Sequence, residues 1–340
     1  MVKFAPEHCH EYLLKNAPLL LAFSPEKDFE EWRRKVDAKL REIIGDFPRK
    51  TSLNLRVEYE RENELFWEKR FIFTSEAEAD VPCHLLVPKE GKGPFPLIVC
   101  LQGHTKGMHL SLGRSRDDED EQSIRRGDRD FAVQAVHQGY AALALEQRCF
   151  GERADRREEK FRHIPGTCHH AAMTALLLGR TMIGERVWDV SRAIDAISEF
   201  PEIDKERIGC MGNSGGGTIT YFAACLEPRI KAIMPSCYVC TFRESIGKID
   251  HCECNYIPGF LKYFDLPDLA CLIAPRPLVV VAGRQDEIFP IEGVKEAFDK
   301  ISQIYEKVGA PDKCRLVIGE GGHRFYAEIA WPIFRKITGW

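Results

Sequence analysis

A serine flanked by glycines is the strongest sign of nucleophilic chemistry in this sequence. Gly212-Asn213-Ser214-Gly215-Gly216 fits the pattern G-x-S-x-G. An apolar run at 207–211 comes before it, and a stretch rich in small residues at 216–224 follows. Glycines let the backbone cross closely at a strained strand-to-helix turn, which exposes the serine between them. We predict that Ser214 is a nucleophile. The alternative is a tight turn or a phosphate loop, although neither a following lysine nor a G-x-G-x-x-G spacing fits well.

A carboxylate and a histidine follow Ser214 in the chain order that this kind of turn requires. A serine hydroxyl is a poor nucleophile at neutral pH and needs a base, which itself needs an orienting acid. Asp286 comes just past an apolar run at 277–282, with Glu287 as the second choice. His323 follows the run at 314–318 in a glycine-rich loop. We predict a Ser214–Asp286–His323 triad; the plainer alternatives are a solvated turn acid and a surface histidine.

Two backbone N–H groups are needed to bind the oxyanion of an acyl-transfer intermediate. Each of them lowers the activation free energy by roughly 3–4 kcal/mol. Gly215, directly after the nucleophile, is the first candidate. His104 is the second, in the loop at 101–107 after the first buried run, with Thr105 in reserve. We expect the His104 side chain to form a pocket wall or a structural hydrogen bond, and not to act as a second base.

Strand-like and helix-like segments alternate along most of the chain, which predicts a mostly parallel sheet flanked by helices. Three β-type runs at 53–59, 66–74 and 81–87 come first and predict antiparallel edge strands. Six later runs predict core strands, at 96–101, 140–145, 207–211, 230–235, 277–282 and 314–318. Helical periodicity marks 130–138, 186–199, 216–226 and 293–308, and also 25–45, where Ser24 is the expected N-cap. We predict an α/β catalytic domain at 51–340 with an N-terminal helical extension at 1–50.

Three segments do not fit this alternation. Residues 112–130 are dense in charge and are expected to form a solvated loop, and residues 8–10 (His-Cys-His) a loose tail. The insertion at 237–270 is long for a structureless connection and is predicted to be a lid. Its cysteines have two interpretations, a thiol-lined lid or a zinc site. The candidate ligands of such a zinc site are Cys237, Cys240, His251, Cys252 and Cys254.

Composition excludes several classes of protein. The 340 residues are 44% hydrophobic and 29% charged, with a net charge of −4. This balance does not favour binding to nucleic acid or to an anionic membrane. The apolar run at 17–23 is too short to span a bilayer and lacks the features of a signal peptide. The 13 cysteines are an odd number, so reduced thiols and a cytoplasmic location are expected.

These motifs together resemble a known family. Gln102-Gly103-His104 after a strand, Gly-Asn-Ser-Gly-Gly, Gly-x-x-Asp-x-x-x-Pro and Gly-Gly-His look like the α/β-hydrolase fold. The nearest branch resembles acetyl xylan esterases and cephalosporin deacetylases, with related dienelactone-hydrolase-like proteins. Residues 145–153 are similar to that branch's Asp-x-Arg-x-x-Gly loop. The chain departs from the pattern in having QGH for HGY or HGG, and Glu146 for Asp, and its serine argues against true dienelactone hydrolases.

The resemblance implies a serine esterase that cleaves small carboxylic esters through an acyl-enzyme, with O-acetylated carbohydrates as candidate substrates. The predicted substrate-binding residues are Gln102, Arg148, Asn213 and Tyr256. Neither a cofactor nor a metal is expected, and the partner is a small-molecule ester; related esterases often form homo-oligomers. The alternatives are a peptidase of the prolyl-oligopeptidase type, which would normally carry a large N-terminal propeller, and a non-catalytic binding protein with this fold.

Overall fold

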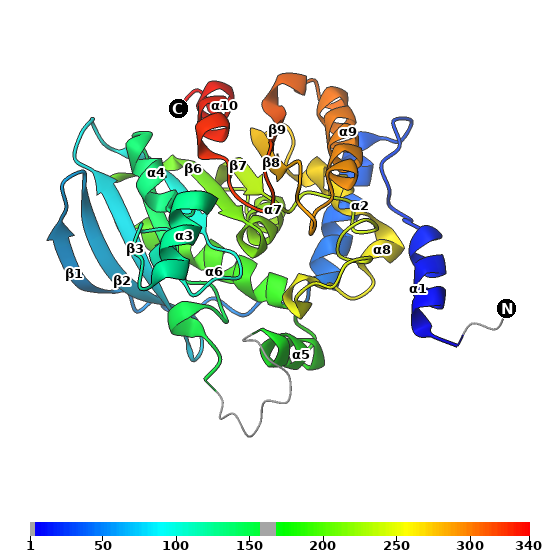
Figure 1. The fold of residues 1–340 in the computed structure, drawn as a ribbon, viewed down its shortest axis with the longest axis horizontal. Coiled ribbons are helices and arrows are strands. Elements are labelled where there is room, and N and C mark those ends of the chain that lie inside the picture. The colour runs from blue at the N-terminus through cyan, green and yellow to red at the C-terminus, as the bar shows by residue number, and fades with distance from the viewer. Residues whose placement is uncertain (1–3, 157–167) are drawn as a thin grey trace.

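The computed structural model describes residues 4–156 and 168–340, and its strands form one nine-stranded sheet (Figure 1). The strands are β1 (Arg56–Glu62), β2 (Phe66–Glu76), β3 (Ala79–Pro88), β4 (Phe95–Leu101), β5 (Ala141–Leu145), β6 (Ile203–Asn213), β7 (Ile230–Ser236), β8 (Leu278–Gly283) and β9 (Cys314–Gly319). The α-helices are α1 (Pro6–Lys15), α2 (Phe29–Ile43), α3 (Asp118–Gly127), α4 (Phe131–His137), α5 (His169–Leu177), α6 (Met182–Ile197), α7 (Gly215–Leu226), α8 (Phe260–Tyr263), α9 (Ile291–Lys307) and α10 (Ala327–Thr338).

The strand order in the sheet is β1-β2-β3-β5-β4-β6-β7-β8-β9. Strands β1, β2 and β3 pair antiparallel, and β3 is also antiparallel to β5. From β5 to β9 every pair is parallel. The predicted parallel sheet with antiparallel edge strands is therefore confirmed. The carboxyl ends of β4, β6, β8 and β9 consequently lie along one edge, where ligands bind in open parallel sheets.

Helices cover both faces of the sheet, and the side chains of β4 show how its two faces differ. Leu97, Val99 and Leu101 pack into a core that includes residues of α2, α6, α7 and α9. Ile98 and Cys100 point the other way, into a core shared with α4 and α10. A strand that is covered on both sides reads as a continuous apolar run, which explains the unbroken sequence of β4.

The amphipathic helix of the N-terminal extension begins later than its sequence suggests. Ser24 is not the N-cap, because its hydroxyl hydrogen-bonds to Glu26 instead. Asp28 caps α2, and its carboxylate accepts a hydrogen bond of 2.7 Å from the N–H of Glu31. The predicted apolar stripe is present, because Trp32, Val36 and Leu40 are buried.

The rest of the extension packs against the insertion at 237–270. Residues 8–10 do not form a tail, because they belong to α1, which lies at the end of the molecule opposite β1 (Figure 1). Leu14 of α1 packs so closely on Gly247 that a Cβ atom there would lie 2.7 Å from the leucine side chain. Further along, the N–H of Leu21 donates a 2.6 Å hydrogen bond to the carbonyl of Tyr263. The extension thus supports the insertion along much of its length.

The charged segment at 112–130 is not a simple solvated loop, since it contains α3. The carboxylate of Asp117 caps this helix by accepting a 3.0 Å hydrogen bond from the N–H of Asp120. Acidic residues fill its first turn, and Arg125 and Arg126 stand in its last turn. This arrangement suits the helix dipole, which favours negative charge at the N-terminus and positive charge at the C-terminus. The dense charges of this segment therefore belong to a capped helix.

The insertion between β7 and β8 holds only short helical pieces, namely α8 and two 3-10 turns at Glu253–Asn255 and Leu266–Leu272. It contributes residues to a cavity described below, so its role as a lid stays a prediction. Among the described residues, none of the helices combines the length and the apolar character required to cross a membrane.

Candidate active site

Ser214 occupies a sharp turn between β6 and α7. Its backbone has φ 58° and ψ −124°, an unfavourable region for a residue with a side chain. The turn is held by a 2.9 Å hydrogen bond from the N–H of Ser214 to the carbonyl of Ser236 on β7. Strain of this kind persists only where the surroundings impose it, and it is concentrated at functional sites.

Glycines make this turn possible, because they have no side chain. A Cβ atom on Gly216 would lie 2.0 Å from the carbonyl oxygen of Leu101, and one on Gly212 would lie 2.6 Å from the same atom. A Cβ atom on Gly103 would lie 2.6 Å from the carbonyl oxygen of Asn213. Glycine is therefore required at each position by close approach of the backbone. The loop after β4 and the serine turn consequently lie directly against each other.

Asp286 and His323 form a hydrogen-bonded pair at the ends of β8 and β9. The Nδ1 atom of His323 lies 2.8 Å from Oδ2 of Asp286, whose other oxygen accepts the N–H groups of Ile288 and Phe289 at 2.9 and 3.2 Å. Burial alone would raise the pKa of Asp286, but the hydrogen bond and charge of His323, with these N–H groups, hold the pKa below its usual value. Glu287, the second choice, is exposed.

The imidazole of His323 is held in place by packing as well. The Phe289 ring stacks on it, with ring centroids 5.8 Å apart and planes 17° apart. Within the described residues, neither Nε2 of His323 nor the hydroxyl of Ser214 is engaged in a hydrogen bond. Asp286 therefore fixes the imidazole through Nδ1, and Nε2 is left to exchange a proton.

His104 approaches the serine turn from the loop after β4. A Cβ atom on Gly215 would lie 3.1 Å from Nδ1 of His104, so this ring edge faces the N-terminus of α7. The Nε2 atom points the other way and lies 3.1 Å from Sγ of Cys254. Burial alone would lower the pKa of His104, but hydrogen bonds to Cys168 and Cys254 outweigh it and raise the pKa to about 9. The His104 side chain lines the cavity and hydrogen-bonds to Cys254, and that it does not act as a second base stays a prediction.

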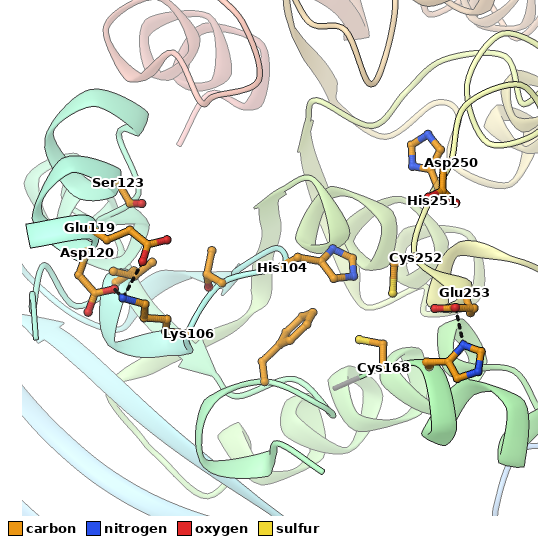
Figure 2. Close-up of a pocket in the computed structure, with 14 residues that line it drawn as sticks. His104, Lys106, Glu119, Asp120, Ser123, Cys168, Asp250, His251, Cys252 and Glu253 are labelled. Atoms are coloured by element: carbon orange, nitrogen blue, oxygen red, sulfur yellow. Dashed lines mark hydrogen bonds and ion pairs between the residues drawn. The ribbon is translucent and has the colours of Figure 1, made fainter. Parts of the chain in front are cut away.

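A cavity of about 670 Å³ opens beside His104 (Figure 2). Lys106, Glu119 and Asp120 lie on one side of His104, and Cys168, Cys252 and Glu253 lie on the other. Its remaining lining residues are Thr105, Leu110, Ser123, Phe150, His169, Asp250 and His251. The cavity is therefore built from the loop after β4, α3, Phe150, the start of α5 and the insertion. Its wall carries four carboxylates and one lysine, and Glu119 pairs with Lys106, Asp120 with His109 and Glu253 with His169.

Comparison with known proteins places this arrangement in a family. The sequence profile described as "Abhydrolase family" matches residues 9–320. The chain belongs to this family. The predicted α/β-hydrolase fold is confirmed by this match and by the strand order. The curated protein "Putative hydrolase YtaP" of Bacillus subtilis (strain 168) is 27% identical over 307 residues, which make up 88% of this chain and 96% of that protein.

Solved structures share the fold of this hydrolase-family chain. One, described as "a putative acetyl xylan esterase" from Bacteroides fragilis, superposes with a TM-score of 0.76 at 20% identity, and the match covers 97% of this chain and 84% of that one. Another, a glucuronoyl esterase from Solibacter usitatus, gives a TM-score of 0.69 at 18% identity over 95% and 96% of the two chains. At these identities the likeness establishes the fold alone.

Two of the predicted substrate-binding residues lie underneath the site of this hydrolase fold. Asn213 is fully buried, and its Oδ1 accepts a 2.8 Å hydrogen bond from the hydroxyl of Ser236. Gln102 is also buried, and its amide donates to the hydroxyl of Ser111 and the carbonyl of Arg129, each at 2.7 Å. The Asn213 side chain ties the serine turn to β7, and the Gln102 side chain ties the loop after β4 to Ser111 and Arg129. Neither side chain lines the cavity.

The other two predicted substrate-binding residues lie outside the cavity lining. Arg148 is surrounded by carboxylates, with contacts of 2.7 Å to Glu76, 3.0 Å to Glu185 and 2.8 Å to Asp189. Tyr256 is partly exposed, and its hydroxyl hydrogen-bonds to a backbone carbonyl of the insertion. The Arg148 loop motif therefore corresponds here to a buried ion-pair network.

The four cysteines of the insertion separate into three places. Cys237 lies beside the Asp286–His323 pair, where burial and the charge of Asp286 raise the pKa of its thiol to about 12. Cys240 contacts the carbonyl of Pro290 instead. The remaining pair, Cys252 and Cys254, gathers with His104 and a cysteine that sequence reasoning did not single out, Cys168. Its only signal was another Cys-His pair, Cys168-His169, far from the others in the chain.

Proposed function

We propose that this protein is a carboxylic ester hydrolase in which Ser214 is the nucleophile, His323 the general base and Asp286 the orienting acid. One observation carries the proposal: the hydrogen-bonded Asp286–His323 pair stands at the same sheet edge as the strained Ser214 turn. A carboxylate that orients an imidazole, and an imidazole that activates a serine hydroxyl, are the catalytic parts of a serine hydrolase. The names of the similar proteins, two esterases and a hydrolase, support the same chemistry.

In the proposed reaction, the Ser214 hydroxyl attacks the ester carbonyl while Nε2 of His323 accepts its proton. The backbone N–H groups of Gly215 and His104 receive the oxyanion, and Thr105 is the reserve donor. His323 then gives the proton to the departing alcohol, which leaves an acyl-enzyme. A water molecule, deprotonated by the same imidazole, hydrolyses that intermediate and restores the serine.

We propose that the natural substrate is the acetyl ester of a neutral, polar alcohol such as a carbohydrate. The cavity beside His104 is lined mainly by charged and polar side chains that can hydrogen-bond to hydroxyl groups. Its excess of carboxylates disfavours a product that keeps a fixed negative charge in the cavity, as a uronate would. Acetate is small and can leave. The acetyl xylan esterase description of a similar structure agrees with this choice.

Hydrolysis of p-nitrophenyl acetate, followed by labelling with a fluorophosphonate probe, tests the activity. We expect turnover, stoichiometric labelling of the wild-type chain and no labelling of Ser214→Ala. A wild-type protein that neither hydrolyses the ester nor reacts with the probe would be a binding protein with this fold. Rapid cleavage of peptide p-nitroanilides without esterase activity would favour a peptidase.

The substrate is tested by comparing acetylated xylo-oligosaccharides with methyl glucuronate esters under identical conditions. We expect acetate release to have the higher kcat/KM. A preference for the glucuronate ester would overturn the acetyl assignment while leaving the esterase mechanism intact. We also propose a cytoplasmic location, which suits the unpaired state of all 13 cysteines.

A further inference from the structure

Four metal-ligating side chains converge at one end of the cavity. The Nε2 or Nδ1 atom of His104 and the Sγ atoms of Cys168, Cys252 and Cys254 all lie within 4.8 Å of one another. Figure 2 shows His104, Cys168 and Cys252 pointing toward a common centre. The four residues come from three separate segments: the loop after β4, the residue before α5, and the insertion. Tertiary folding, and not one local motif, brings these ligands together.

The spacing suits a tetrahedral zinc ion. Zinc binds cysteine sulfur at about 2.3 Å and histidine nitrogen at about 2.0–2.1 Å, so ligand atoms around it lie roughly 3.5–3.8 Å apart. The 4.8 Å limit on this group and the 3.1 Å between His104 and Cys254 bracket that range. Three thiolates and one imidazole are also a donor set typical of structural zinc sites.

A buried arginine supplies an independent observation. The Arg186 side chain is almost wholly buried, and its guanidinium lies 3.3 Å from Sγ of Cys254 and 3.4 Å from Sγ of Cys168. Its other contacts are the carbonyl of Arg148 and the face of the Phe150 ring. No carboxylate pairs with it among the described residues. A buried cation needs a compensating anion, and the facing sulfur atoms are the groups able to provide it.

We propose that His104, Cys168, Cys252 and Cys254 bind one structural Zn²⁺ ion. Three thiolates and a neutral imidazole around Zn²⁺ carry one net negative charge, and the adjacent Arg186 guanidinium neutralises it. Binding releases to solvent the protons that the three thiols and the liganding imidazole nitrogen carry, and no redox step is involved. This set shares Cys252 and Cys254 with the zinc alternative drawn from the sequence, but replaces Cys237, Cys240 and His251.

The ion has a structural role because protein side chains fill all four positions, which leaves none for water or substrate. Its consequence for catalysis rests on the proposed function. His104 uses Nε2 for the metal, while its ring edge faces Gly215 and its backbone N–H is a proposed oxyanion donor. Zinc therefore makes His104 a positioning residue: it fixes the loop after β4 against the serine turn and ties the insertion to it.

Metal analysis of the full chain, purified without chelator, tests the site. We expect about one zinc ion per chain, with X-ray absorption showing three sulfur ligands and one nitrogen ligand at the distances given above. Cys252→Ser and Cys254→Ser should lose most of the zinc. Cys240→Ser is the matched control, a buried thiol of the same insertion, and should retain it. Absence of zinc after growth and purification in zinc-supplemented medium would overturn the proposal, as would a Cys252–Cys254 disulfide found by mass spectrometry.

A second pair of variants tests the ligand set. Cys149 is another buried thiol next to Cys168, but it lies outside the group of four. We expect Cys149→Ala to keep one zinc ion and His104→Ala to bind Zn²⁺ at least tenfold more weakly in a competition with a chromogenic chelator. The reverse result would replace the proposed ligand set with four cysteines.

The metal and esterase proposals fail in distinguishable ways. Ser214→Ala should contain the wild-type amount of zinc although it is inactive. An active enzyme that contains no zinc when purified from zinc-supplemented medium would reject the site and leave the esterase proposal intact. In zinc-depleted wild-type enzyme we expect kcat for p-nitrophenyl acetate to fall at least tenfold and to recover on adding Zn²⁺, with fluorophosphonate labelling slowed in parallel. Full kcat in the depleted protein would reject the positioning role of His104.

Discussion

Two imidazoles stand at the sheet edge that holds the serine turn, and their surroundings differ. His323 meets a carboxylate through Nδ1 and an aromatic face, and its Nε2 atom is free of hydrogen bonds within the described residues. His104 directs Nε2 into a group of thiols, with a buried guanidinium behind them. An imidazole can exchange protons with a substrate only through a nitrogen that nothing else occupies. The first environment therefore suits a base and the second an anchor.

The difference shows how one residue type is assigned two tasks by its partners. A carboxylate that accepts from Nδ1 fixes the tautomer and stabilises the cation formed during proton transfer. At His104 the thiolates occupy Nε2 instead, so this nitrogen cannot exchange a proton with a substrate and the ring is held in place. Sequence motifs located both histidines, but only their neighbours distinguish their roles.

The largest effect is expected at the serine turn. Ser214→Ala should lower kcat by about 10⁴–10⁶, because the residual activity of a triad lacking its nucleophile comes from binding and the oxyanion donors. Single-turnover kinetics with p-nitrophenyl acetate measures the loss, and circular dichroism checks that the fold is retained. Near wild-type turnover would show that Ser214 is not the nucleophile, and the proposed roles of the two histidines would then be wrong.

Changing the anion on the His323 side should have the next largest effect. Asp286→Asn should lower kcat by about 10³–10⁴, because the imidazole loses its orienting anion and its preferred tautomer. Glu287→Gln is the matched control, an exposed neighbour that should change kcat less than twofold. If the two phenotypes were exchanged, the acid would be Glu287, and the observed pairing of Asp286 with His323 would not be the working one.

Gly103 tests the contact between the His104 loop and the turn. Its missing Cβ atom would collide with the carbonyl of Asn213 at 2.6 Å, so Gly103→Ala must push the loop and turn apart. A displacement on the order of 1 Å in a catalytic arrangement costs about 10²-fold in rate. We expect this loss in kcat with the zinc content unchanged. Unchanged kcat would mean that the loop does not contribute an oxyanion donor.

The smallest effect concerns stability at low pH. Because the pKa of Asp286 is held below its usual value of about 3.9, its anion favours the folded state. That contribution is complete above the usual pKa and is lost as pH falls through the lowered value. The difference in Tm between wild type and Asp286→Asn should therefore be constant above about pH 5 and shrink below about pH 4. Protonation at sites that do not contact Asp286 affects both proteins alike and cancels. A difference that instead grew on acidification would contradict the lowered pKa.

The sequence was sufficient for the fold and for the candidate triad, for a physical reason. Apolar runs covered on both faces identify parallel strands directly, and Ser214, Asp286 and His323 each follow such a run at its carboxyl end. Residues that follow parallel strands emerge at the same edge of the sheet whatever the details of packing. The helix α3 was missed because acidic residues in a first turn resemble those of a solvated loop unless the cap at Asp117 is recognised.

Long-range partners could not be predicted in the same way. Arg148 lies in a loop that resembles a functional motif, yet its partners Glu76 and Asp189 come from β2 and α6. Cys168 lies next to Cys252 and Cys254 because α5 packs near the 3-10 turn at Glu253–Asn255. Such contacts depend on how distant elements dock, which no local pattern encodes. The oligomeric state and the boundary between extension and catalytic domain stay predictions.

The acidic wall of the cavity affects the end of the catalytic cycle as well as the choice of substrate. Hydrolysis of a neutral ester generates a carboxylate. In the proposed reaction this anion forms at Ser214, next to the cavity that begins at His104 and carries Glu119, Asp120, Asp250 and Glu253. Repulsion between like charges weakens the binding of the product relative to the ester from which it came. Deacylation would then be followed by rapid expulsion of the acid, so the enzyme would continue to work while acetate accumulates around it.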